Sequence, residues 1–216
     1  LQGDDWGYGY NLGARYAVND DLDLGLGYRS KIDHKIEGKG SVAGLGFYSP
    51  TAVALTTPES AYFGAKYDLN DKVQLLSGIS WTRWSRVQEI NAVAPQSADI
   101  DSDDIQLKYK DTWQYALGAN YQLNNRLQLK SGAAYEEGAN SSSDYRNPRV
   151  PDSNKIWLTT GFEYKITPDI KFDFAYMHQR FKKSSSTLDA SATKASLNTV
   201  YKAKANSVAV ALGFNF

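Results

Sequence analysis

The last nine residues, 208–216, alternate strictly between large apolar residues and small or polar ones. Valine, leucine and phenylalanine are at every second position, and alanine, glycine and asparagine lie between them. Side chains of a β-strand point alternately to its two faces, so this pattern predicts a strand with one wholly apolar face. The sequence then ends on an aromatic residue, Phe216, without a polar tail.

The same alternation recurs eight times upstream. The predicted strands are residues 6–18, 22–29, 63–69, 73–81, 113–123, 127–135, 156–166 and 170–176. Nearly all of them are rich in aromatic and β-branched residues, which suit a pleated surface. With the final segment, the sequence predicts an all-β, antiparallel protein of nine strands.

The connections between these strands are of two kinds that alternate. Tight turns of Asn, Asp and Pro are predicted at residues 19–21, 70–72, 124–126 and 167–169. Long polar loops are predicted at about 34–51, 86–110, 137–153 and 182–204. All tight turns should therefore lie at one end of the sheet, as in outer-membrane barrels. A strand of about ten residues, tilted by about 45°, spans about 24 Å, close to the apolar band of such barrels.

Each predicted strand has an apolar and a polar face. Aromatic residues of the apolar face form two rows, Tyr16, Tyr67, Tyr121 and Tyr164 beside the turns and Trp6, Tyr28, Trp81, Trp113 and Tyr135 toward the loops. The polar face carries Arg15, Asp23, Arg29, Gln74, Gln114, Asn120, Gln122, Gln128, Lys130, Glu163, Lys165, Lys171 and Asp173. A soluble sandwich would expose this polar set, whereas a barrel in lipid would turn it into a lumen. The aromatic rows, the turn asymmetry and the terminal Phe favour the barrel.

Composition narrows the function. The 24 basic and 24 acidic residues balance, so we expect no nucleic-acid partner. No apolar run approaches the ~18 residues of a membrane helix, but barrel strands only alternate and need no such run. The absence of cysteine excludes disulfides and thiolate metal sites.

The predicted strand count is odd, whereas bacterial single-chain barrels have an even number of strands. The first residues, LQGDD, show neither an initiator Met nor a charged-then-apolar leader. We therefore expect residues 1–216 to be the C-terminal part of one longer barrel domain, with at least one strand upstream.

Several segments resemble the outer-membrane long-chain fatty acid transporter family (FadL-like), which also takes up aromatic hydrocarbons. They are residues 3–13 (GDDWGYGYNLG), 27–32 (GYRSKI), 55–59 (LTTPE), 80–85 (SWTRWS), 150–158 (VPDSNKIWL) and 176–178 (YMH). Two positions depart from the family's pattern, since Thr57 replaces a Leu and Lys155 an Arg. The terminal strand with its final Phe is similar to the assembly signal of outer-membrane barrels.

The resemblance implies a fourteen-stranded barrel plugged by an N-terminal hatch, of which this chain supplies the last nine strands. It implies passive, ligand-gated uptake of long-chain fatty acids or other hydrophobic compounds by a monomer in contact with membrane lipid. The long loops would be extracellular, and the tight turns and the C-terminus periplasmic. A structural or adhesive barrel that acts through its long loops is the alternative.

A fatty acid needs an apolar groove and a cation for its carboxylate. The basic candidates for the lumen are Arg15, Arg29, Lys130, Lys155 and Lys171, of which Arg29 and Lys155 lie nearer the loops. Structural ion pairs with Asp23, Glu163 or Asp173 are the alternative role for these cations. Leu45, Phe47 and Tyr48 could form an outer capture patch. The Gly7/Gly9 and Gly25/Gly27 pairs are predicted to thin the lumen side of their strands.

Other chemistry finds little support in the sequence. The acidic run at residues 99–104 has the first spacing of a calcium loop but lacks the glycine and the bidentate Glu. His34 and His178 stand alone, so we expect no metal site, no cofactor and no catalytic residues. An outer-membrane lipid hydrolase would need a Ser/His pair on the lipid face, for which His178 is the candidate.

Overall fold

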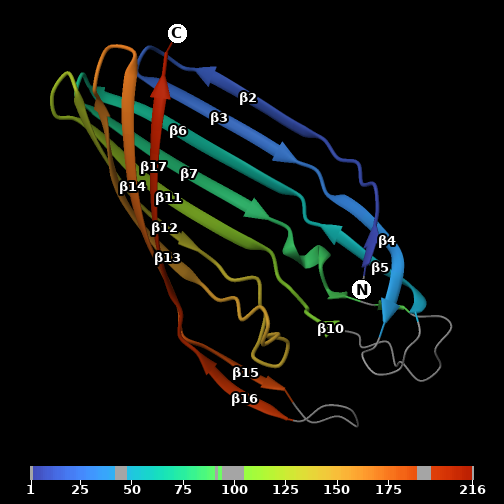
Figure 1. The fold of residues 1–216 in the computed structure, drawn as a ribbon. Coiled ribbons are helices and arrows are strands. Elements are labelled where there is room, and N and C mark those ends of the chain that lie inside the picture. Colours follow the sequence, from blue (N-terminus) through green and yellow to red (C-terminus); the bar gives the residue numbers. More distant parts are fainter. Residues whose placement is uncertain (1, 42–47, 91, 94–104, 189–195, 216) are drawn as a thin grey trace.

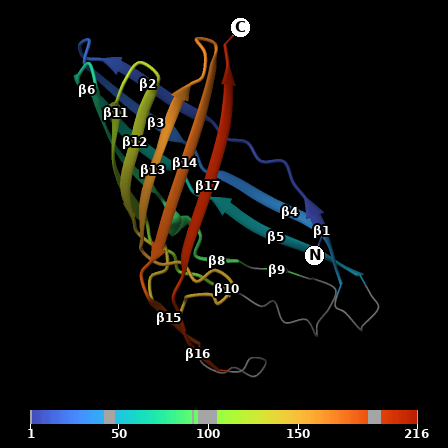
Figure 2. The ribbon, with the colours of Figure 1, turned by 60° about the vertical axis from the view of Figure 1, so that its left-hand side comes forward.

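Nine strands form one antiparallel sheet in which neighbours in sequence are neighbours in space (Figures 1 and 2). The structure, a computed structural model, describes residues 2–41, 48–90, 92–93, 105–188 and 196–215. In order across the sheet the strands are β2 (Asn11–Ala17), β3 (Leu22–Arg29), β6 (Ser60–Asn70), β7 (Val73–Thr82), β11 (Thr112–Gln122), β12 (Leu127–Glu136), β13 (Lys155–Lys165), β14 (Ile170–Phe181) and β17 (Lys204–Phe214). The nine strands predicted from the alternation are confirmed.

The tight turns are shaped by side chains that bond to the backbone. The Oδ1 atoms of Asn19, Asn70 and Asn124 each accept two backbone N–H groups within the same turn, at 2.8–3.1 Å. In the last turn the Thr167 hydroxyl accepts the N–H of Ile170 at 3.0 Å. These bonds offer the chain a local reversal. They hold the strand pairs in the register that keeps each apolar face whole.

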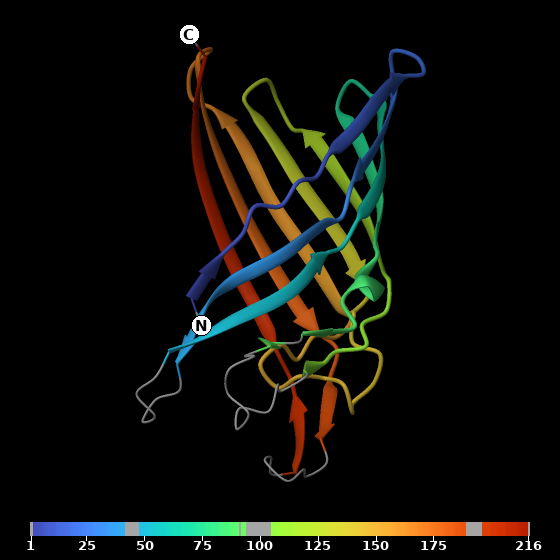
Figure 3. The same cartoon turned by 90° about the vertical axis from the view of Figure 1, so that its right-hand side faces the viewer.

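Two of the four predicted long loops contain paired strands, which corrects the sequence interpretation. β4 (Ile32–Ser41) and β5 (Tyr48–Thr57) pair as a hairpin, and β15 (Ser184–Leu188) and β16 (Leu197–Tyr201) form another. Both continue strands of the main sheet beyond its edge (Figure 3). The polar and small residues there gave a weak apolar signal, but backbone pairing needs no apolar face. The short strands β8 (Glu89–Ile90), β9 (Ala92–Val93) and β10 (Ile105–Gln106) lie in the predicted loop 86–110, and the 3₁₀ turn η1 (Trp84–Arg86) leads into it.

The first predicted strand, residues 6–18, is also corrected. Only residues 11–17 belong to the main sheet, while β1 (Gln2–Asp4) pairs with β4. Between them, Gly7 lies so close to β4 that a Cβ there would overlap the Ile32 and His34 side chains. Glycine, which has no Cβ, permits this close approach. Trp6 lies between β1 and β2, outside any regular strand.

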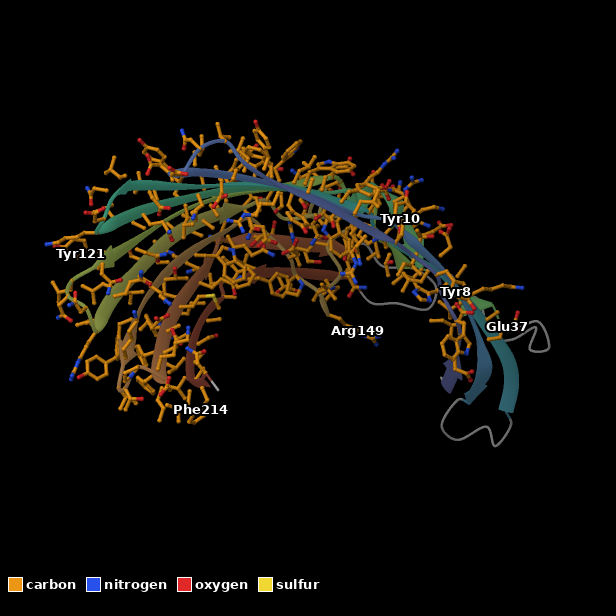
Figure 4. All side chains as sticks on the ribbon, turned by 90° about the horizontal axis from the view of Figure 1, so that it is seen from above. Tyr8, Tyr10, Glu37, Tyr121, Arg149 and Phe214 are labelled. Carbon is orange, nitrogen blue, oxygen red and sulfur yellow. The ribbon has the colours of Figure 1, made fainter. Side chains whose placement is uncertain are left out.

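The tight turns and the C-terminal end of β17 lie at one end of the molecule, and the two extended hairpins lie at the other (Figure 3). Seen from above, the sheet is an open arc with Tyr121 on its convex side (Figure 4). The alternation of the strands places Leu117 and Val210 on this same face, where they are 70% and 66% exposed. Within the described residues, no second sheet packs over the convex face as it would in a sandwich.

Candidate functional site

The concave face carries a belt of paired charges close to the tight turns. Its first part is a chain of contacts across five strands: Arg15, Asp23, Lys66, Asp68, Gln74 and Asn120. Arg15 Nη2 lies 2.8 Å from Asp23 Oδ2, and Lys66 Nζ lies 2.9 Å from the same oxygen. Cations and carboxylates alternate along this series of contacts, so their charges cancel within the belt.

The second part of the belt is centred on Lys130 in β12. Its Nζ lies 3.1 Å from Glu163 Oε2 in β13 and 3.2 Å from Asp173 Oδ1 in β14. Lys171 Nζ is 4.0 Å from the same Glu163 oxygen. A side chain of β12 thus reaches across β13 to β14, which the inward curvature of this face favours. The belt therefore ties three strands together.

An open apolar groove of about 480 Å³ lies on the concave face between the belt and the loops. Of the residues that line the groove, those that the alternation of the strands places on the concave face are Leu76, Gly78, Gln114, Ala116, Gly118, Gly132, Ala134, Trp157 and Thr159. Ala134 lies opposite Ala116 on one neighbouring strand and opposite Trp157 on the other. The two alanines form a low floor, and the indole of Trp157 forms one wall. The groove has the size and the apolar character of a small-molecule site.

Gly27 admits an aromatic side chain onto the concave face. It lies opposite Tyr62, and a Cβ on Gly27 would overlap the Tyr62 ring. The ring thus rests on the backbone of β3 rather than projecting into the lumen. The predicted thinning at Gly27 makes room for a side chain of the barrel itself.

A buried carboxylate, Glu59, lies where β5 passes into β6 at the loop end of the sheet. Its side chain is 6% exposed and binds two arginines. Arg83 Nη1 donates to Oε1 at 3.1 Å, while Arg86 donates through Nε to Oε2 at 3.0 Å and through Nη2 to Oε1 at 2.9 Å. The hydrogen bonds from Arg86, aided by Arg83, lower the pKa of Glu59 from 4.5 to about 2. The cluster fixes η1 and the start of the following segment to the barrel rim.

A second rim cluster surrounds Lys155, the first residue of β13. Its Nζ lies 3.0 Å from Asp152 Oδ1 and 3.1 Å from Glu136 Oε1. Glu136 also accepts the indole N–H of Trp157 at 3.1 Å, which sets the orientation of the groove wall. Asp152 accepts the N–H of Ala139 at 2.7 Å and so holds the loop between β12 and β13 in place.

That loop is packed against β15. The Arg146 guanidinium donates to the carbonyl oxygens of Asp152 and Ser185, and the fully buried Ser186 hydroxyl donates to the Arg146 carbonyl at 2.6 Å. Lys108 Nζ donates to the Tyr145 hydroxyl at 2.9 Å and lies 4.4 Å from the centre of that ring. The loop end is therefore a connected structure rather than a set of independent loops.

The structure places four of the five predicted cations in these clusters. Arg15, Lys130 and Lys171 lie in the belt and Lys155 lies at the rim, each paired with a carboxylate. Arg29, the last residue of β3, is exposed at the loop end of the concave face and has no acidic partner within the described residues. Their role in ligand binding stays a prediction. Leu45 and Phe47, the Tyr48 side chain, the acidic run 99–104 and Phe216 lie outside the described residues.

The belt also contains Lys66 and Asp68, which the sequence interpretation missed. Both are an even number of positions from Tyr62 and Gly64 in β6, so they lie on the same face as these residues and on the opposite face from the apolar residues of β6. The alternation itself could therefore have identified them. Glu59 and Arg83 were part of the resembling segments, but nothing in the sequence pairs them, since 24 positions separate them.

The two histidines show no catalytic or metal geometry. His178 Nδ1 lies 2.7 Å from Asn206 Oδ1 on the convex face, and His34 Nδ1 lies 3.3 Å from Asp5 Oδ2. No described group of three His, Cys, Asp or Glu residues could hold a metal ion. Nor does any described helix have the length and apolar character to cross a membrane.

Comparison with known proteins finds one family over the whole chain. The model of the outer membrane protein transport protein family (OMPP1/FadL/TodX) matches residues 1–216. Among curated relatives, outer membrane protein P1 of Haemophilus influenzae is 31% identical over 186 residues, which are 82% of this chain and 39% of the relative. An outer membrane protein of Neisseria meningitidis serogroup B is 30% identical over 200 residues, which cover 82% of this chain and 43% of the relative.

The long-chain fatty acid transport protein of Escherichia coli K12 is 25% identical over 200 residues, 82% of this chain and 43% of the relative. The chain thus spans less than half of the length of these three proteins. A crystal structure of a Pseudomonas aeruginosa FadL homologue superposes with a TM-score of 0.82 and 21% identity, over 95% of this chain and 52% of that one. This likeness shows that the nine-stranded sheet has the fold of part of such a barrel.

Proposed function

The chain belongs to the outer membrane protein transport protein family (OMPP1/FadL/TodX), and on this basis we propose that it forms part of a passive transporter. The complete protein would carry long-chain fatty acids or other hydrophobic compounds across the bacterial outer membrane, with passage gated by the ligand itself through a plugged barrel. It would act as a monomer. Relatives named as a long-chain fatty acid transport protein and a toluene transporter support this class of cargo.

The apolar groove on the concave face is the observation that carries the proposal. An outer-membrane barrel ordinarily has a polar lumen, and the charged belt follows that pattern. The groove of Leu76, Ala116, Ala134 and Trp157 departs from it, since it offers apolar contact inside the barrel. A hydrophobic cargo gains from such contact. An adhesive barrel acting through its loops has no need of it.

We propose Arg29 as the first group to meet the cargo's carboxylate. The other four predicted cations already hold carboxylates, and a ligand would have to displace these partners. Arg29 lies at the loop end, is exposed, and has no such competitor among the residues described. Its planar guanidinium can bind both oxygens of a carboxylate. Lys155 lies at the same end and would guide the ligand only after releasing Asp152 or Glu136.

The membrane placement belongs to the proposal as well. The convex face would contact lipid, because its large apolar residues are exposed and its tyrosines form a row beside the tight turns. The tight turns and the end of β17 would be periplasmic, and the hairpins and long loops extracellular. Short periplasmic turns and longer extracellular loops are typical of outer-membrane barrels.

The test fills the groove in the full-length protein. Ala134→Phe places a ring on the groove floor, while Ala133→Phe places the same ring on the convex face one residue away. Cells that express each variant are given radiolabelled oleate, and initial uptake is compared with an empty-vector control. We expect Ala134→Phe to lose most of the uptake above the control and Ala133→Phe to keep it.

Two results would contradict the proposal. If oleate uptake by wild-type cells equalled that of empty-vector cells, the protein would not be a fatty acid transporter. If Ala134→Phe and Ala133→Phe gave equal uptake at matched surface expression, the groove would not lie on the path of the fatty acid. Arg29→Gln should raise the oleate concentration needed for half-maximal uptake without changing the maximal rate, because it affects capture rather than passage.

A further inference from the structure

Four cations gather on the outside of the sheet where β14 and β17 pass into the hairpin β15–β16. This basic rim patch consists of Arg180, Lys183, Lys202 and Lys204, all exposed. Arg180 and Lys204 lie directly opposite each other in the β14–β17 ladder, and Phe181 N–H donates to the Ala203 carbonyl at 3.1 Å beside them. The four residues line a hollow of about 700 Å³ together with His178, Phe181 and Ala203.

The patch is not neutralised. No carboxylate lines the hollow, and none of the four cations has an acidic partner among the described residues. Like charges directly opposite each other on neighbouring strands destabilise a sheet. The belt on the concave face shows the contrast, since Lys66 and Lys130 each contact two carboxylates. An external anion would satisfy the rim patch.

Strand alternation puts Arg180 and Lys204 on the same face as the exposed apolar residues. Two residues nearer the tight turns, His178 lies opposite Asn206, and two further, Tyr176 lies opposite Val208. Asn206 Oδ1 accepts a hydrogen bond from the Tyr176 hydroxyl at 2.9 Å and lies 2.7 Å from His178 Nδ1. Along these two strands the convex face therefore changes from apolar to polar to cationic.

This order matches the layers of a lipid leaflet. Four residues of strand separate Tyr176 from Arg180, about 13 Å along the strand and about 9 Å in depth at a 45° tilt. That depth corresponds to the step from the edge of the hydrocarbon, where Tyr is enriched, into the headgroup layer. Cations at headgroup depth attract anionic lipids.

We propose that the basic rim patch binds the phosphate of an anionic lipid in the outer leaflet. Phosphate oxygens accept charge-assisted hydrogen bonds, and the guanidinium of Arg180 can bind two of them at once. The acyl chains of the same lipid would lie on the apolar residues below, such as Val208 and Val210. The inference rests on the proposed contact of the convex face with lipid, and it concerns a surface on the opposite side of the sheet from the transport groove.

The experiment uses the full-length protein in a mild non-ionic detergent. Dioleoyl phosphatidate, which carries a phosphate monoester, is titrated, and bound lipid is counted by native mass spectrometry. Zwitterionic dioleoyl phosphatidylcholine, which has no net charge, is titrated for comparison. The test variant is Arg180→Gln/Lys204→Gln. The matched control is Lys72→Gln/Arg126→Gln, which removes two exposed cations at the tight turns.

We expect the test variant to bind phosphatidate about 25-fold more weakly, because each of the two cations near a lipid surface contributes about five-fold. The control should change by less than two-fold, and phosphatidylcholine should bind all three proteins alike. Equal phosphatidate binding by wild type and test variant would overturn the proposal. So would displacement of the lipid by millimolar inorganic phosphate, which indicates a site for free anions, or by polyglutamate, which indicates an acidic protein partner.

Lipid binding by the basic rim patch and oleate transport are measured separately. Oleate uptake is measured in the same variants, and Arg180→Gln/Lys204→Gln should retain the wild-type rate, because the patch lies outside the lumen. Heat-modifiable migration on electrophoresis verifies that each variant has folded.

Discussion

Replacing Glu59 by Gln tests whether the buried carboxylate secures the barrel rim. The change keeps the shape of the side chain and removes the charge that Arg83 and Arg86 share. The pKa of Glu59 falls from 4.5 to about 2 in the folded state, which corresponds to an upper bound of about 3 kcal/mol of stabilisation. The Arg83 and Arg86 side chains are 44% and 37% exposed, so water screens the pair. We therefore expect a loss of about 2 kcal/mol.

Hydrogen exchange measures this loss where it occurs. The Arg83 amide donates to the Glu59 carbonyl at 3.0 Å, and the Val87 amide closes η1 at 2.9 Å. In the full-length protein reconstituted in lipid, a loss of about 2 kcal/mol should speed exchange at these amides about 30-fold at pH 6. The control is Glu37→Gln, since the Glu37 side chain is 67% exposed and its ion pair is with the exposed Lys35. It should alter exchange less than two-fold.

The pH dependence has a definite sign. Because folding lowers the pKa of Glu59, its stabilisation is complete above pH 4.5 and is lost as the pH falls from 4.5 toward 2. The ratio of exchange rates between Glu59→Gln and wild type should therefore narrow from pH 6 to pH 3. A ratio below two-fold at pH 6, or one that does not change with pH, would refute the assigned role of the carboxylate.

Three further perturbations follow from the two faces of the sheet, each measured by urea unfolding of the full-length protein in lipid vesicles. Gly27→Ala should cost about 1–3 kcal/mol because its methyl group overlaps the Tyr62 ring, and adding Tyr62→Ala should recover most of the loss; equal costs in both backgrounds would contradict this. Leu117→Lys at the middle of the convex face should cost about 2–4 kcal/mol in lipid, whereas Ala116→Lys on the concave face should cost less than half as much; a reversed order would mean that the faces are wrongly assigned. Lys130→Met should cost about 1 kcal/mol, because it leaves two carboxylates of the belt without their cation while its own side chain is partly exposed; an unchanged unfolding midpoint would show that the belt contributes no stability.

The strand ends beside the four tight turns could be predicted to within one residue, because their signal is local, whereas the loop ends of several strands differ by three to five residues. An apolar side chain at every second position marks a strand with one oily face, and Asn19, Asn70 and Asn124 mark reversals through bonds to their own turns. β3 begins and ends at the predicted residues, 22 and 29. The same alternation separated the polar face from the apolar one and so identified four of the cations that the structure places in the belt and at the rim.

The hairpins beyond the main sheet could not be predicted in this way. β4–β5 and β15–β16 are held by backbone hydrogen bonds, which any residue can make, and their side chains carry little apolar pattern. The broken first strand had a misleading signal, since Trp6 and Tyr8 continue the alternation of β2 but the chain there lies against Ile32 and His34. The pattern of apolar and polar residues along the sequence does not predict such contacts between distant segments.

The sequence by itself determined the period of two, the turns, the number of strands in the main sheet and the two chemically different faces, since each depends on residues only a few positions apart. Only the tertiary structure decided which charges meet, as when Lys130 reaches Asp173 across an intervening strand, and where Ala116, Ala134 and Trp157 form a groove. It also brought Arg180 and Lys204 together without a carboxylate between them. These contacts join residues 18 to 43 positions apart, and the curvature and register of the whole sheet bring them together.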